Sequence, residues 1–119
     1  MVTPKVLGQS FPTSTTLTDI YTVPALTSTM ANTITVCNQS STADTFRISI
    51  AIAGAGDSQE QYIYYGNEVP GNTSFQCTSG YTLGATDVIR VYSTNGTCSF
   101  NISGIEAKQT FITDEMLDY

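Results

Sequence analysis

The sequence predicts an all-β protein, an antiparallel β-sandwich of the jelly-roll type with about eight short strands. Three observations lead to this prediction. Apolar side chains alternate with polar ones over several segments, as in strands that bury one face. Threonine, which packs well on a pleated surface, occurs 20 times in the 119 residues. Gly, Pro and Asn, which favour turns, separate the alternating segments at short intervals.

The clearest predicted strand covers residues 45–52. Phe46, Ile48, Ile50 and Ile52 recur at every second position, and Thr, Arg, Ser and Ala stand between them. Because successive side chains of a strand point to opposite faces, we expect the first set in the core and the second set toward solvent.

Further segments are predicted as strands from similar alternation or from their content of strand-forming residues. They cover residues 5–9, 17–23, 33–38, 61–68, 75–83, 87–94 and 97–103. Asn95 and Gly96 separate the last two, and this dipeptide predicts a two-residue hairpin, because a type I′ turn needs positive φ at both positions. The glycine-rich residues 53–60 are predicted to be a loop, since they lack the third glycine and the lysine of nucleotide-binding motifs.

The composition argues against several classes of function. The chain has no histidine, so a Ser-His-Asp triad and a His-ligated zinc site are excluded. It has only four Lys and Arg residues and a net charge of −6, so we do not expect a nucleic-acid-binding surface. No apolar run approaches the roughly 20 residues that span a bilayer. We therefore expect no enzymatic activity, no cofactor, no metal site and no membrane partner.

The ends of the chain and its cysteines bear on its compartment. The first ten residues contain no apolar signal-peptide core, so we expect the protein to stay in the cytoplasm in which it is made, unless it is carried out in an assembly. The cysteines are Cys37, Cys77 and Cys98, and their odd number argues against a disulfide framework. We expect free, buried thiols, because cysteine packs as a small apolar side chain.

The chain is predicted to divide into a sandwich domain, residues 1–106, and an acidic C-terminal arm, residues 107–119. The arm combines three acidic residues with four large apolar side chains. Two interpretations are open: the arm folds back on its own domain, or it docks on a neighbouring subunit. The residues predicted to form a subunit interface are Val6, Phe11, Phe111, Ile112, Met116 and Leu117.

Three of the seven tyrosines lie close together in the sequence, at Tyr62, Tyr64 and Tyr65. A tyrosine ring is apolar and its hydroxyl forms hydrogen bonds, so such a group suits a packed interface. An aromatic surface that binds glycans is the second interpretation of the same residues.

Several segments, taken in order, resemble small structural proteins of tailed bacteriophages, especially phages of cyanobacteria. These segments are residues 6–10, 16–25, 34–38, 45–48, 63–65, 85–89 and 98–106, so the resemblance covers nearly all of residues 5–106. Members of the group often end just after the segment that matches Gly104 to Glu106, so the arm is a departure from it. The resemblance implies a location in the virion, with assembly in the host cytoplasm, and brings no catalytic residues.

Composition and resemblance together predict a virion structural protein whose partners are other virion subunits. A capsid decoration or cement protein is the first expectation, as a homo-oligomer that could be a trimer. A tail, collar or fibre-associated protein is an alternative within the same class. A host-glycan-binding module is an alternative from another class.

Overall fold

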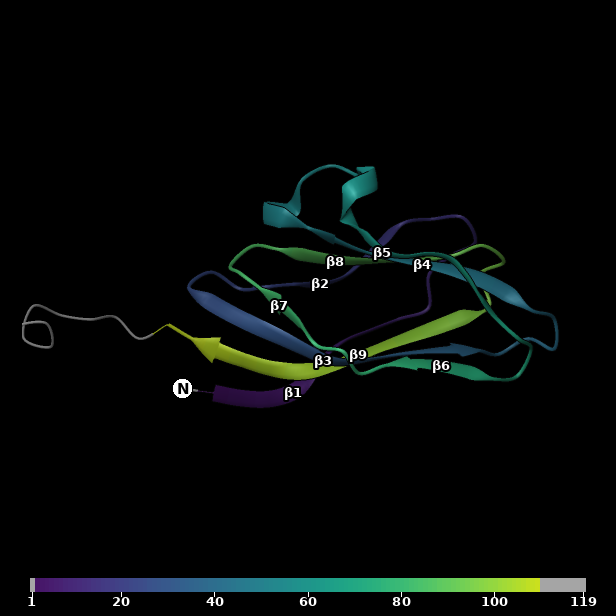
Figure 1. Cartoon of the computed structure of the whole chain (residues 1–119), viewed down its shortest axis with the longest axis horizontal. Coiled ribbons are helices and arrows are strands. Elements are labelled where there is room, and N and C mark those ends of the chain that lie inside the picture. Colours follow the sequence, from purple (N-terminus) through teal and green to yellow (C-terminus); the bar gives the residue numbers. More distant parts are fainter. Residues whose placement is uncertain (1, 110–119) are drawn as a thin grey trace, which may run out of the picture.

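The computed structural model describes residues 2–109, which form two stacked β-sheets (Figure 1). The strands are β1 (Val2–Ser10), β2 (Thr18–Thr22), β3 (Thr27–Asn38), β4 (Asp44–Ala51), β5 (Tyr62–Val69), β6 (Ser74–Cys77), β7 (Tyr81–Leu83), β8 (Val88–Ser93) and β9 (Cys98–Lys108). Two single turns of 3-10 helix, η1 (Ile52–Gly54) and η2 (Gln59–Gln61), lie between β4 and β5. Within residues 2–109 there is no helix with the length and apolar character needed to cross a membrane.

The order of the strands in the two sheets is that of a jelly roll. One sheet has the order β1-β9-β3-β6, with β7 also paired to β3, and the other has the order β2-β8-β4-β5. β4 pairs with β5, β3 with β6 and β7, β2 with β8, and β1 with β9, all antiparallel, as in one long hairpin rolled into two sheets. The predicted all-β antiparallel sandwich is therefore confirmed.

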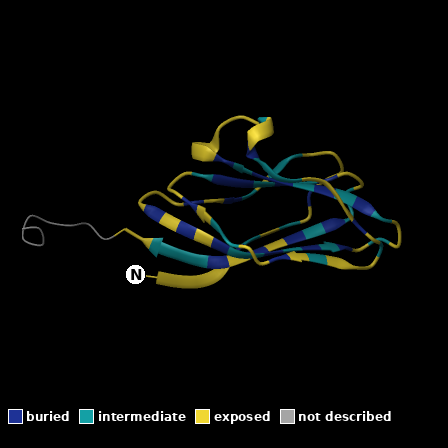
Figure 2. Ribbon diagram, viewed as in Figure 1, coloured by how far each residue is buried: buried dark blue, intermediate teal, exposed yellow. Residues whose placement is uncertain are grey.

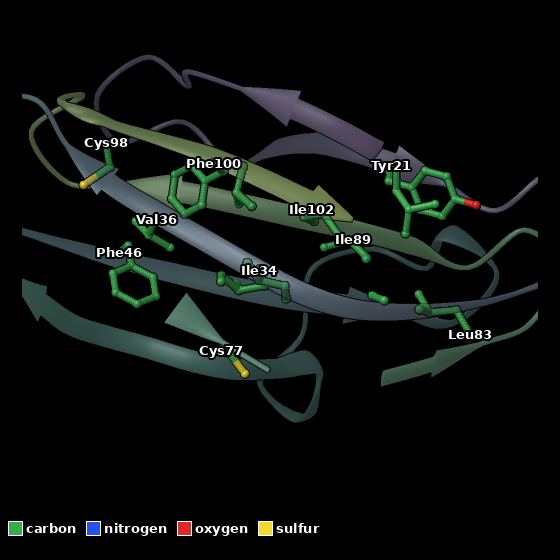
Figure 3. Close-up of a cluster of buried hydrophobic side chains, with 14 of the residues drawn as sticks. Tyr21, Ile34, Val36, Phe46, Cys77, Leu83, Ile89, Cys98, Phe100 and Ile102 are labelled. Atoms are coloured by element: carbon green, nitrogen blue, oxygen red, sulfur yellow. The ribbon is translucent and has the colours of Figure 1, made fainter. Parts of the chain in front are cut away.

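The core lies between the two sheets, where the inward faces of their strands are buried (Figure 2). Phe46 of β4 is 0% exposed, and its ring centroid lies 5.4 Å from that of Phe75 and 6.2 Å from that of Phe100. Figure 3 shows Phe46 and Phe100 together with aliphatic side chains from both sheets. The predicted apolar face of residues 45–52 is thus in the core, except that Ile52 lies beyond the end of β4 and is 75% exposed.

The outer face of β4, predicted to meet solvent, is partly covered by the connection between β4 and β5, residues 52–61. Ser49 of this face is 0% exposed. Arg90 of β8 holds the connection in place, because its guanidinium donates to the carbonyl oxygens of Gly54 at 3.2 Å and Ala55 at 2.7 Å. Figure 1 shows the two 3-10 turns standing above this sheet. The alternation of β4 predicts which side chains point outward, but the covering loop decides their exposure.

The predicted hairpin at Asn95 and Gly96 is wrong. The strands on either side, β8 and β9, belong to different sheets and do not pair. Gly96 has a positive φ of 72°, whereas Asn95 does not, so the turn is not of type I′. The backbone N–H of Asn95 instead donates to Oδ1 of Asp44 at 2.9 Å. This hydrogen bond to a distant strand outweighs the local preference of the dipeptide.

Asp44 is a buried carboxylate, 1% exposed, where the two sheets meet. Its Oδ2 accepts hydrogen bonds from the hydroxyls of Ser93 at 2.5 Å and Thr97 at 3.1 Å, and its Oδ1 accepts from the backbone N–H of Thr45 at 2.7 Å. Burial alone would raise the pKa of Asp44, but the hydrogen bonds from Ser93, Asn95, Cys98 and Thr45 hold the pKa below its usual value. Asp44 therefore joins β4 to the connection between β8 and β9 as an ionised group.

β9 continues beyond residue 106, where the sequence places the end of the sandwich domain. Ala107 pairs with Val2 of β1, and Lys108 pairs with Thr27 of β3. The sheet therefore includes two residues assigned by sequence to the arm. The rest of the predicted arm from residue 110 lies outside the described residues.

Candidate functional site

Two tyrosines lie together on the outer face of the sheet β2-β8-β4-β5, at the start of β5. A β-bulge places them there: Tyr62 and Tyr64 pair with successive residues of β4, so Ile63 is an extra residue in its strand. Tyr62 and Tyr65 therefore share one side of the strand, although they are three positions apart. Their ring centroids are 5.0 Å apart, and the rings are nearly perpendicular, at 88°.

Arg47 of β4 contacts this pair of rings and connects it to a third tyrosine. Its guanidinium carbon lies 4.2 Å from the ring centroid of Tyr65 and 4.2 Å from that of Tyr92 on β8. The register explains both contacts, because Arg47 lies directly opposite Tyr65 in one neighbouring strand and opposite Tyr92 in the other. A cation–π contact contributes about 0.5–1 kcal/mol at an exposed site. Tyr65 is thereby held in position, although 61% of it remains exposed.

The surface between these rings is concave. Gln59, Tyr62 and Tyr65 line a hollow of about 340 Å³. We call this hollow the tyrosine corner; the name does not refer to the Greek-key motif of β-sandwiches. The hydroxyl of Tyr62 donates to Oδ1 of Asp57 at 2.7 Å. Partial burial, and then this hydrogen bond, raise the pKa of Tyr62 above its usual value, so the hydroxyl keeps its proton at neutral pH. The corner thus combines two apolar ring surfaces with an amide, a hydroxyl and a nearby carboxylate.

Tyr64 is not part of this surface, which corrects one of the three predicted residues. Its ring points into the core, where its centroid lies 5.8 Å from that of Phe46 and 5.3 Å from that of Phe75. The bulge at Ile63 is the physical reason, because it shifts the alternation by one residue and puts Tyr65, not Tyr64, beside Tyr62.

The outer face of the opposite sheet is apolar at the end that carries the N-terminus. Pro4 of β1 lies opposite Ile105 of β9, which in turn lies opposite Met30 of β3, so the three form a row across three strands. Val2 and Val6 of β1 flank this row and are 61% and 57% exposed. We call this surface the outer β1 face; its residues are Val2, Pro4, Val6, Met30, Ile105 and Ala107.

Among the described strands, β1 is also the edge strand of its sheet and pairs with β9 alone. Pro4 and Lys5 are residue types that natural proteins place on sheet edges to hinder pairing with other chains. Phe11 follows β1 directly and is 57% exposed. Two predicted interface residues, Val6 and Phe11, are thus exposed along one edge of the sandwich. The other four, Phe111, Ile112, Met116 and Leu117, lie outside the described residues.

No protein-family model, curated protein or solved structure matches this chain. The jelly roll is therefore assigned from the strand order alone, and the two surfaces from the contacts within them. The resemblance of residues 5–106 to phage structural proteins stays a prediction.

The three cysteines are free, as predicted; Cys77 and Cys98 are buried, whereas Cys37 is only partly buried. Burial, and then the hydrogen bond to Asp44, raise the pKa of Cys98 to about 12, so this thiol is protonated at neutral pH. Across residues 2–109, no three acidic or cysteine side chains are grouped so that they could hold a metal ion.

Sequence reasoning missed Arg47 and Tyr92 at the tyrosine corner, and Met30 and Ile105 on the outer β1 face. The alternation of residues 45–52 does place Arg47 on an outward face. Its contact with two tyrosines depends on the register of three strands that are distant in sequence. No local sequence pattern contains that register. The pairing of β4 with β5 and β8 would have to be known before these contacts could be predicted.

Proposed function

We propose that this chain is a structural subunit of a tailed-bacteriophage particle, and specifically a capsid decoration or cement protein. The outer β1 face carries the proposal, because it presents a row of apolar side chains on the flank of an edge strand. Contiguous exposed apolar surface of this kind marks sites of protein association. The jelly-roll strand order, which occurs in viral capsid domains, and the resemblance of residues 5–106 give further support by analogy.

In this function the protein acts by binding and not by catalysis. Each Å² of apolar surface removed from water contributes about 25 cal/mol to the favourable free energy of burial. Specific interfaces bury about 1,200–2,000 Å² in total, so each partner contributes about 800 Å² of its surface. Copies bound through this face, to each other or to capsid subunits, would tie neighbouring subunits together and oppose the outward pressure of the packaged genome.

A place in the tail, collar or fibre base would use the same contacts. The number of copies in the particle distinguishes the two locations. Cryo-electron microscopy of the phage is expected to show hundreds of copies on the shell. A dozen or fewer at one vertex would instead assign the chain to the tail or collar, and absence from the particle would overturn the proposal.

Replacing Val6 with Asp is expected to weaken self-association of the purified protein at least about tenfold, because the interface would then bury an unpaired charge. Sedimentation velocity over a range of concentrations measures the change. Val6 is 57% exposed, so the variant should fold. Thr22→Asp adds the same charge at an exposed position on β2, in the other sheet, and should associate like the parent. Equal association of Val6→Asp and the parent would show that the outer β1 face is not the interface between copies of this chain.

A further inference from the structure

We infer that the tyrosine corner is a binding site for the pyranose ring of a neutral sugar. It lies on the opposite side of the sandwich from the outer β1 face, so it is separate from the contacts proposed for assembly. A subunit bound to its particle through β1, β9 and β3 would leave this second surface free.

The two rings supply the apolar part of such a site. One face of a pyranose consists of C–H groups, which pack on an aromatic ring because its face carries partial negative charge. Tyr62 and Tyr65 stand nearly perpendicular beside a hollow of about 340 Å³, so a sugar could stack on one ring and contact the other. This volume is at the lower end of the range for small-molecule sites, about 300–1,000 Å³.

Polar groups around the corner match the hydroxyl edge of a sugar. The side-chain amide of Gln59 both donates and accepts hydrogen bonds, and the Tyr62 hydroxyl is already oriented by Asp57. The charged groups of the adjoining loop are the exposed acids Asp57 and Glu60. Arg47 is engaged by two tyrosine rings. An anionic sugar would be repelled by the two acids, which favours a neutral one.

The corner is also rigid before any ligand arrives. Contact with Arg47 holds the Tyr65 ring, the hydrogen bond to Asp57 holds that of Tyr62, and the bulge at Ile63 fixes both on one side. A site formed in advance loses little conformational entropy on binding, which allows a small contact area to bind measurably.

Titration of the ¹⁵N-labelled full chain with glucose, galactose, mannose and N-acetylglucosamine, followed by two-dimensional NMR, tests this inference. At least one sugar is expected to bind with a Kd of about 1 mM, with shift changes centred on residues 57–65 and Arg47. Tyr65→Ala is expected to weaken binding at least about tenfold, because it removes one ring of the corner. Tyr65 is exposed, so the variant should keep its fold.

Phe11→Ala is the matched control, because it removes an aromatic ring of similar exposure that does not line the corner. It should bind the same sugar as the parent. No shift changes up to about 100 mM neutral sugar, or equal binding by Tyr65→Ala, would overturn the inference. A sialylated sugar is titrated in the same way. If it binds more tightly than the four neutral sugars, the assignment to a neutral sugar is overturned. Tyr65→Ala should self-associate like the parent, so failure here is distinguishable from failure of the assembly proposal.

Discussion

Replacing Asp44 with Ala is expected to lower the free energy of unfolding by about 3–5 kcal/mol. The carboxylate is 1% exposed and accepts hydrogen bonds from three side chains and two backbone groups. Its removal leaves these donors without their partner in the interior, where an unsatisfied polar group is destabilising by about 1–3 kcal/mol. Urea denaturation at pH 7, followed by circular dichroism, measures the loss.

The same carboxylate should make stability depend on pH. An Asp in an unfolded chain has a pKa of about 3.9, and the hydrogen bonds hold the pKa of Asp44 lower than this in the folded state. Its contribution to stability is therefore fully present above the unfolded pKa and is lost as the pH falls through the folded pKa. The free energy of unfolding of Asp44→Asn should therefore fall less than that of the parent as the pH is lowered.

The control for Asp44→Ala is Glu68→Ala, which removes an exposed carboxylate on β5. It should change the free energy of unfolding at pH 7 by no more than about 0.5 kcal/mol. Unfolding of Asp44→Ala at the urea concentration of the parent would contradict the role of this network.

Replacing Phe46 with Ala should cost about 3–5 kcal/mol of unfolding free energy, because it leaves a cavity where side chains of both sheets meet. The ring is 0% exposed and contacts the rings of Phe75 and Phe100 from the opposite sheet. The measurement is the urea midpoint, with the slope of the transition unchanged. Phe11→Ala, at an exposed site, should shift the midpoint little. Similar midpoints for the two variants would mean that the contact between the sheets does not depend on Phe46.

The strands that sequence predicted best are those whose alternation involves large apolar side chains. Residues 45–52 were predicted, and β4 covers Asp44–Ala51. The first half of β3 was missed, because its buried positions include Thr27 and Thr29. Hydroxyls can be buried there only because they find partners: the Thr29 hydroxyl lies 2.8 Å from that of Tyr21 on β2. A pattern of apolar residues does not contain such pairs.

The tyrosine corner shows the same limit. The cluster of tyrosines in the sequence indicated an aromatic surface, and two of the three predicted residues form it. Which two depends on the bulge at Ile63, and a bulge follows from the pairing of β5 with β4 and not from β5 alone. The wrong hairpin at Asn95 has a similar cause, since the buried Asp44 on another strand sets that turn.

The pairing of β1 with β9 has a consequence for synthesis of the chain. Val2 pairs with Ala107, so β1, the first of the described strands to be translated, has no partner until nearly the whole described domain has been translated. Pairings between residues so distant in sequence also form slowly, because the entropy cost of closing a long loop comes before the favourable contacts are made. During that interval Val2 and Val6 stand on an unpaired strand, and Pro4 and Lys5 between them hinder wrong pairing with other nascent chains. The same residues that hinder pairing at the edge of the folded sandwich thus also hinder wrong pairing during co-translational folding.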